Sequence, residues 1–141
     1  MVDVENMVID LVQKALNSAG YNIDVTSTYD PSPSSFPSVA VYEEENHTYR
    51  RSQDEALTEH HAEVMYTVNV YSNKKNGAKQ QAKKIFSVVD GALQNIRFTR
   101  TTTIPDANAD KTIYRIVARY EAVIEEPKTI NGDKVYQVYR G

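Results

Sequence analysis

The residues best suited to metal chemistry are two adjacent histidines in the sequence Glu59-His60-His61-Ala62-Glu63. Histidine and glutamate are side chains that bind zinc, so this run could contribute to a metal site. On a strand, however, neighbouring side chains point to opposite faces, which makes it difficult for His60 and His61 to share one ion. No second cluster in the sequence supplies further ligands, and the chain has no cysteine. The pattern favours a solvated boundary between a loop and a strand, and we expect no metal and no cofactor.

Three consecutive glutamates, Glu43-Glu44-Glu45, are the next candidates for chemistry. A carboxyl group becomes useful for acid–base catalysis when apolar surroundings raise its pKa, and we expect no such surroundings here. The run is therefore interpreted as a solvated rim. The sequence also contains no glycine-rich phosphate loop, no G-x-S-x-G and no H-E-x-x-H motif. We expect a protein that is not an enzyme.

A basic row forms the third candidate, because Lys75, Lys79 and Lys83 are four residues apart and share one side of a predicted helix. The simplest interpretation is a solvated helix face, since most lysines are exposed. A second is electrostatic pairing with an acidic surface such as Glu43–Glu45 of another copy. A third is nucleic-acid binding, but the RNA-recognition consensus is absent and the net charge is -3.

Length and composition restrict the classes of protein further. The 141 residues match the usual size of one domain, and we expect a single domain over residues 1–141. The sequence begins without a basic segment, so we expect no signal peptide, and no apolar run is long enough to span a membrane. There are ten tyrosines against three phenylalanines and no tryptophan, a bias that suits half-buried sheet faces and protein interfaces.

A strand followed by a helix positions these candidates. Over Ala62–Tyr71, a period-two pattern places four apolar residues on one side (Val64, Tyr66, Val68 and Val70) and a second set of residues on the other (Met65, Thr67, Asn69 and Tyr71), which predicts a strand with one buried face. The period then changes to 3.6 over Ala78–Ile96, which predicts an amphipathic helix. Gly91 lies within this helix, and the alternative is that the helix ends at Asp90-Gly91.

The remaining chain predicts further elements in a definite order. Residues 3–19 read as an amphipathic helix, with Asp3 as N-cap and Gly20 as a left-handed C-terminal cap. Strands are expected at Tyr21–Thr26, Ser38–Tyr42, Phe98–Ile104, Thr112–Ile124 and Lys134–Tyr139, with a proline-rich loop at 29–37, a turn at 105–110 and an Asn131-Gly132 hairpin turn. The predicted class is α+β: a mainly antiparallel sheet with two helices packed on one face, in the order α-β-β-β-α-β-β plus a C-terminal hairpin over 127–141.

The segment Glu43–His60 is the most polar part of the chain and has few apolar residues with which to build structure of its own. Ordering each residue costs on the order of 1–2 kcal/mol, which this composition does not offset. We therefore expect a flexible loop that a partner orders. Because strands flank it, an extended hairpin arm is the alternative.

With this order established, the chain resembles the tail terminator (tail completion, head–tail joining) proteins of long-tailed bacteriophages and prophages. The resemblance covers nearly the whole chain and depends on an ordered set of segments rather than on one motif. These are the helix ending at Gly20, the Pro31–Pro37 loop before Val39-Ala40-Val41, the Glu43–His60 insertion, Val68–Asn73 leading into a Lys/Ala helix with Val88-Val89-Asp90, Phe98–Thr101, and Ile113–Tyr120.

The resemblance implies a virion structural protein, assembled in the bacterial cytoplasm, that forms a hexameric ring on the end of the tail tube. Its implied partners are further copies of itself, the tail tube protein and the head–tail connector protein, with DNA passing through the ring without sequence-specific binding. It implies no catalytic residues. The alternatives are another neck or connector component, or more distantly a small nucleic-acid-binding domain.

A closed ring requires two different surfaces of each subunit to meet. We expect one to come from the 43–60 arm or the terminal hairpin, and the other from the lysine row or the strand face carrying two arginines. The candidate interface residues are Glu43, Glu44, Glu45, Tyr49, Arg50, Arg51, Lys75, Lys79, Lys83, Arg115 and Arg119.

Overall fold

A computed structural model describes residues 3–30, 33–48, 61–107, 112–125, 128–130, 133–135 and 138–139. The predicted α+β class and the order α-β-β-β-α-β-β are confirmed. The elements are α1 (Glu5–Ser18), β1 (Val25–Thr26), β2 (Ser38–Thr48), β3 (His61–Ser72), α2 (Ala78–Asn95), β4 (Thr99–Ala107), β5 (Tyr114–Glu125), β6 (Lys128–Ile130), β7 (Asp133–Val135) and β8 (Val138–Tyr139).

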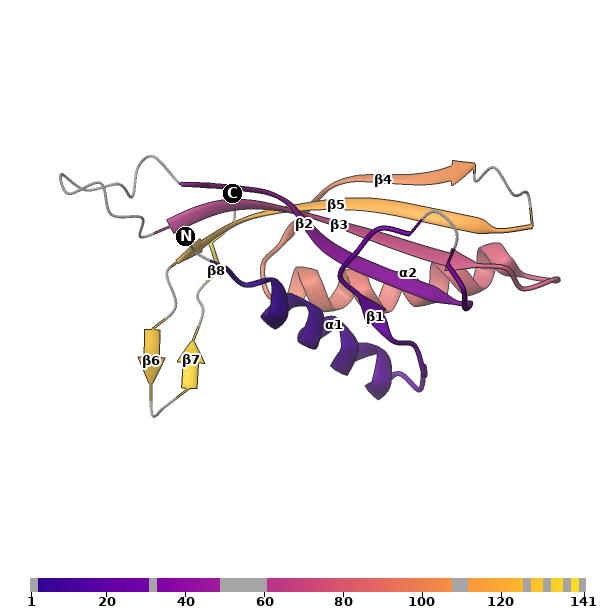
Figure 1. Ribbon diagram of the computed structural model, residues 1–141, viewed down its shortest axis with the longest axis horizontal. Helices are drawn as coiled ribbons and strands as arrows, with labels where there is room; N and C mark the ends of the chain where they lie inside the picture. The colour runs from indigo at the N-terminus through magenta and orange to yellow at the C-terminus, as the bar shows by residue number, and fades with distance from the viewer. Residues whose placement is uncertain are drawn as a thin grey trace.

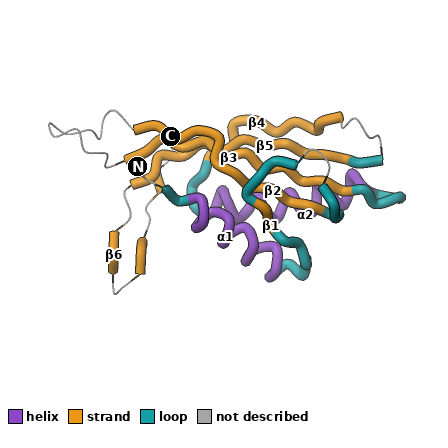
Figure 2. Tube along the Cα trace, in the orientation of Figure 1, coloured by secondary structure: helices purple, strands orange, loops and turns teal. Residues whose placement is uncertain are grey.

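The main sheet has the strand order β1-β2-β3-β5-β4, with β8 pairing to the end of β5. All neighbouring strands are antiparallel except β1 and β2. Both helices lie on the same side of this sheet (Figures 1 and 2), with α1 against β1 and β2 and α2 against β3, β5 and β4. The opposite side, here called the outer face, carries no helix among the described residues.

Helix α1 is built on an apolar stripe whose fully buried members are Val8, Val12 and Leu16. The predicted left-handed cap is confirmed: Gly20 has φ +89°, and the Tyr21 N–H donates to the Leu16 carbonyl at 3.0 Å. The Asp3 N-cap is wrong by one residue, since Val4 occupies the N-cap position. The Asp3 carboxylate still accepts the Glu5 N–H at 3.1 Å, so it satisfies one free donor at the start of the helix.

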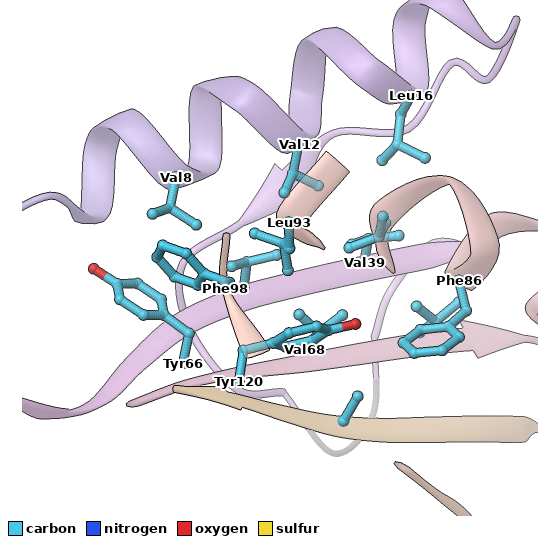
Figure 3. Close-up of a cluster of buried hydrophobic side chains, with 14 of the residues drawn as sticks. Val8, Val12, Leu16, Val39, Tyr66, Val68, Phe86, Leu93, Phe98 and Tyr120 are labelled. Carbon is cyan, nitrogen blue, oxygen red and sulfur yellow. The ribbon is translucent and has the colours of Figure 1, made fainter. Parts of the chain in front are cut away.

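Helix α2 begins after Gly77, which has φ +97°, and runs unbroken through Gly91 to Asn95. The alternative end at Asp90-Gly91 is therefore wrong. Tertiary packing explains why, because Leu93 beyond the glycine is buried in the core with Val89. Figure 3 shows the two helices meeting the sheet through residues such as Val8, Leu93 and Tyr120.

Several strand boundaries differ from the sequence-based ones. Strand β1 has only two residues, and the expected last strand is divided into β7 and β8. Strand β4 continues through Pro105 to Ala107, where the sequence predicts a turn. Proline is tolerated there because β4 is the edge strand, so one side of its backbone has no ladder to join. The hairpin prediction is confirmed by the pairing of Ile130 with Asp133.

Strand β2 is the largest correction, because it extends from Ser38 to Thr48 and includes the first third of the supposed loop. Its residues Glu45–Thr48 pair with the beginning of β3, so long-range pairing stabilises a segment that cannot do so alone. Of the two interpretations of Glu43–His60, the extended hairpin arm is correct for this first part. Residues 49–60 lie outside the described residues.

Candidate assembly interface

The outer face of the sheet is less exposed than the sequence pattern predicts. The alternation predicts that β3 buries only the side bearing Val64, yet Thr67, Asn69 and Tyr71 on its other side are also buried. The reason is a cluster of long side chains that lie across this face rather than a second layer of helix. Arg115 of β5 is the centre of that cluster.

Arg115 is tied to the sheet by hydrogen bonds to a buried amide. Its Nε and Nη2 atoms donate to Asn69 Oδ1 at 2.9 and 2.7 Å. Asn69 Nδ2 in turn donates to the Tyr42 hydroxyl at 3.2 Å. The amide therefore links three adjacent strands, β2, β3 and β5, through one continuous polar chain.

Two aromatic rings complete the surroundings of Arg115. Its guanidinium carbon lies 5.0 Å from the ring centroid of Tyr29 and 5.5 Å from that of Tyr71, within the range of cation–π attraction. Tyr29 also meets Tyr42 edge to face, with 6.5 Å between centroids. Burial raises the pKa of the Tyr71 hydroxyl to about 12, against the opposing effect of the Arg115 charge. Arg115, predicted as an interface residue, thus holds the segment containing Tyr29 over the sheet.

Arg119 lies further along β5 and stays more exposed. Its Nε is 3.4 Å from Glu44 Oε2, and their side chains are 47% and 30% exposed, so this is a solvated ion pair within one chain. Glu45 is also exposed and contacts His47 at 3.3 Å. Glu44 and Glu45 are therefore solvated, as the rim interpretation predicts, and Arg119 is accessible as well, although each of the three has a charged or polar partner within the chain.

Glu43 faces the opposite way, toward the helices. The register of β2 against β3 shifts between Glu43 and Glu45, because Glu44 has no partner residue on β3. As a result, the Glu43 and Glu45 side chains lie on opposite sides of the sheet. The Glu43 carboxylate accepts Asn46 Nδ2 at 3.0 Å and the Tyr66 hydroxyl at 3.4 Å. Burial raises its pKa, and the nearby charges of Asp3 and Glu5 add to the effect. The solvated-rim interpretation is therefore wrong for Glu43.

The lysine row is exposed, as expected, and two of its members border a groove. Lys79 and Lys83 of α2 lie at its rim, and the groove has a volume of about 380 Å³. Its other lining residues are largely apolar (Phe86, Thr103, Pro105, Tyr114 and Ile116). Lys75 precedes α2 and does not line the groove. We call this feature the α2–β4 groove.

A network at the start of β4 holds the strand against α2. Asp90 of α2 accepts the Tyr120 hydroxyl at 2.6 Å and lies 3.2 Å from Arg100 Nη1. Arg100 also lies over the Phe86 ring, 6.0 Å from its centroid. These contacts anchor β4 near Arg100 and leave the α2–β4 groove open toward Pro105.

On the outer face, β4 carries an exposed apolar residue that no sequence motif marks. Ile104 is 49% exposed and lines a shallow hollow of about 250 Å³ with Thr102, Arg115, Val117 and Arg119. Its position in a run of β-branched residues predicts a strand, but only the sheet order shows that this strand lies at the edge of the sheet. Tyr49, Arg50 and Arg51 lie outside the described residues.

Within the described ranges, no helix is long and apolar enough to cross a membrane. The same ranges contain no group of three or more His, Asp or Glu side chains able to hold a metal ion. Neither a scan against protein-family models nor a search of curated proteins finds a match to this chain.

Proposed function

We propose that this protein is a non-enzymatic structural subunit that caps the tail tube of a long-tailed phage or prophage as a ring. In this role it ends tube polymerisation and forms the surface to which the head connector joins. Two arguments support the proposal. One is the resemblance in the order of segments along the chain, and the other is a division of charge across the sheet.

The charge division is the observation that carries the proposal. Residues 3–48, which form α1, β1 and β2 at one edge of the sheet, contain eight acidic residues against one lysine, Lys14, and no arginine. Residues 73–107, which include α2 and β4 at the other edge, contain seven lysines and arginines against two aspartates. We call these the acidic edge and the basic edge.

Opposite charge at opposite edges favours head-to-tail association of identical subunits. The acidic edge of one copy attracts the basic edge of the next, whereas two like edges repel. Contacts of this heterologous type close into rings when the rotation between subunits allows it. A ring on the tube end then has one side for the tail tube protein and one for the connector, with DNA passing through its centre.

The proposal is tested with the tail tube protein encoded by the same phage or prophage. Tube protein is allowed to polymerise in vitro with and without this protein, and tube ends and lengths are examined by negative-stain electron microscopy. We expect rings of about six subunits at one end of each tube and an arrest of growth. Tubes that grow equally long and keep bare ends in the presence of the protein would refute the proposal.

A further inference from the structure

The α2–β4 groove combines an apolar floor with a positively charged rim. Phe86, Tyr114 and Ile116 contribute apolar surface, and Lys79 and Lys83 stand at the side formed by α2. On the other side of the same strand, Ile104 is exposed on the outer face. Both sides of β4 thus offer apolar surface at the basic edge, which suits a partner that is acidic and partly apolar.

The strand directions allow a second copy to continue the sheet. Strands β2, β3, β5 and β4 alternate in direction, and β1 runs parallel to β2. A second copy placed with its β1–β2 edge beside β4 therefore presents strands antiparallel to β4, which is how each other neighbour in the row from β2 to β4 is paired. In this arrangement α1 of the second copy lies on the same side as α2 and its groove.

The backbone does not offer an uninterrupted ladder at either edge. In the C-terminal half of β4, Pro105 has no N–H group to donate to a neighbouring strand. On β2, the Glu43 N–H is already taken by the Glu5 carboxylate at 3.1 Å. Such features limit indiscriminate strand pairing, so the specificity of the contact must come from side chains.

We propose that the α2–β4 groove binds the acidic edge of a second copy of this chain, with Lys79 and Lys83 facing carboxylates of α1 and of the segment before β1. Asp10 of α1 and Asp24, next to β1, are exposed carboxylates of that edge. The inference rests on the self-association in the proposed function, but it does not depend on the tail tube. It names the two surfaces that meet.

Charge reversal at each edge tests this contact. The variants are Lys79→Glu with Lys83→Glu on the basic edge, and Asp10→Lys with Asp24→Lys on the acidic edge. Lys74→Glu with Lys84→Glu is the matched control, because these exposed lysines lie outside the groove and their replacement changes the net charge equally. Association is measured by sedimentation velocity over a concentration series, and folding is checked by circular dichroism and thermal unfolding.

We expect each reversed double variant alone to associate at least tenfold more weakly than the wild type, while the control stays within about threefold. An equal mixture of the two reversed variants should assemble again, because every contact then joins opposite charges in alternating order. Wild-type-like association of the Lys79/Lys83 variant, a mixture that stays monomeric, or a wild type that stays monomeric at millimolar concentration would each overturn the inference. Assembly that follows these rules but does not cap tubes would refute only the proposed function.

Discussion

Asn69 is the residue that connects the outer-face cluster. Its buried amide accepts two bonds from Arg115 and donates one to Tyr42. Asn69→Leu preserves the approximate size of the side chain but leaves a partly buried guanidinium without these acceptors. We expect the free energy of unfolding to fall by about 1–3 kcal/mol, measured by denaturant unfolding. An unchanged stability would show that the cluster does not hold the outer face together.

Thr67 provides the matched control for Asn69 on the same strand and face. Its hydroxyl oxygen is buried and has no hydrogen-bond partner among the described residues. Thr67→Val removes that hydroxyl at nearly constant volume, so we expect unchanged stability or a gain of about 1 kcal/mol. A clear loss would mean that the hydroxyl is hydrogen-bonded in solution.

Glu43 makes stability depend on pH. Because burial raises the pKa of its carboxyl above the ordinary value, the folded state binds a proton more tightly than the unfolded state does. This contribution is complete below the unfolded pKa and is lost as the pH rises through the folded pKa. At pH 7 the ionised group is therefore unfavourable.

Glu43→Gln should accordingly stabilise the protein at pH 7, because the amide oxygen can still accept from Asn46 and Tyr66. We expect a gain of about 0.5 kcal/mol, kept small by solvent screening, and a smaller difference at pH 4. Denaturant unfolding at the two pH values checks this, with the exposed Glu45→Gln as comparison. A variant less stable than the wild type at pH 7 would contradict the argument.

At the level of secondary structure, two glycines occupy different positions in their helices, one in the interior and one at the end. Gly91 lies inside α2. Apart from the adjacent turns of the helix itself, no described atom lies within 4 Å of the position that an alanine methyl group would occupy. Gly20 caps α1 with φ +89°, which other residues adopt poorly. The same substitution should therefore have opposite effects at the two sites.

We expect Gly91→Ala to raise the free energy of unfolding by about 0.5–1 kcal/mol and Gly20→Ala to lower it by about 1 kcal/mol. Thermal unfolding monitored by circular dichroism measures both. Destabilisation by Gly91→Ala would indicate that the surface over Gly91 is occupied in solution, for example by a second subunit.

For the whole molecule, the division into an acidic and a basic edge predicts salt-sensitive association. Screening shortens the range of charge–charge attraction from about 10 Å at 0.1 M salt to about 3 Å at 1 M. We expect the dissociation constant for self-association to rise severalfold over this range in light-scattering measurements. Association that is unchanged or stronger at high salt would point to an apolar contact instead of the charged one.

The sequence alone was sufficient to predict the elements whose apolar residues recur with the period of a helix or a strand. The periodic apolar residues of α1, α2 and β3 predicted those elements, Gly20 predicted the cap of α1, and the Asn131-Gly132 signal predicted the pairing of β6 with β7. Local pattern is reliable there because a helix or strand with one apolar side has only one way to bury it. The exposure of Lys79 and Lys83 followed from the same periodicity, whereas Lys75 is exposed before the start of α2.

Only the tertiary structure decided which strands lie at the edges and what covers the outer face. The polar residues Glu45–Thr48 become strand because β3 pairs with them, and Arg115 becomes an internal tie because Asn69, distant in sequence, lies beside it. Likewise, the carboxyl groups of residues 3–48 and the cations of residues 73–107 lie toward two opposed edges only because the sheet order separates them. Such properties depend on long-range pairing, which no local pattern of side chains encodes.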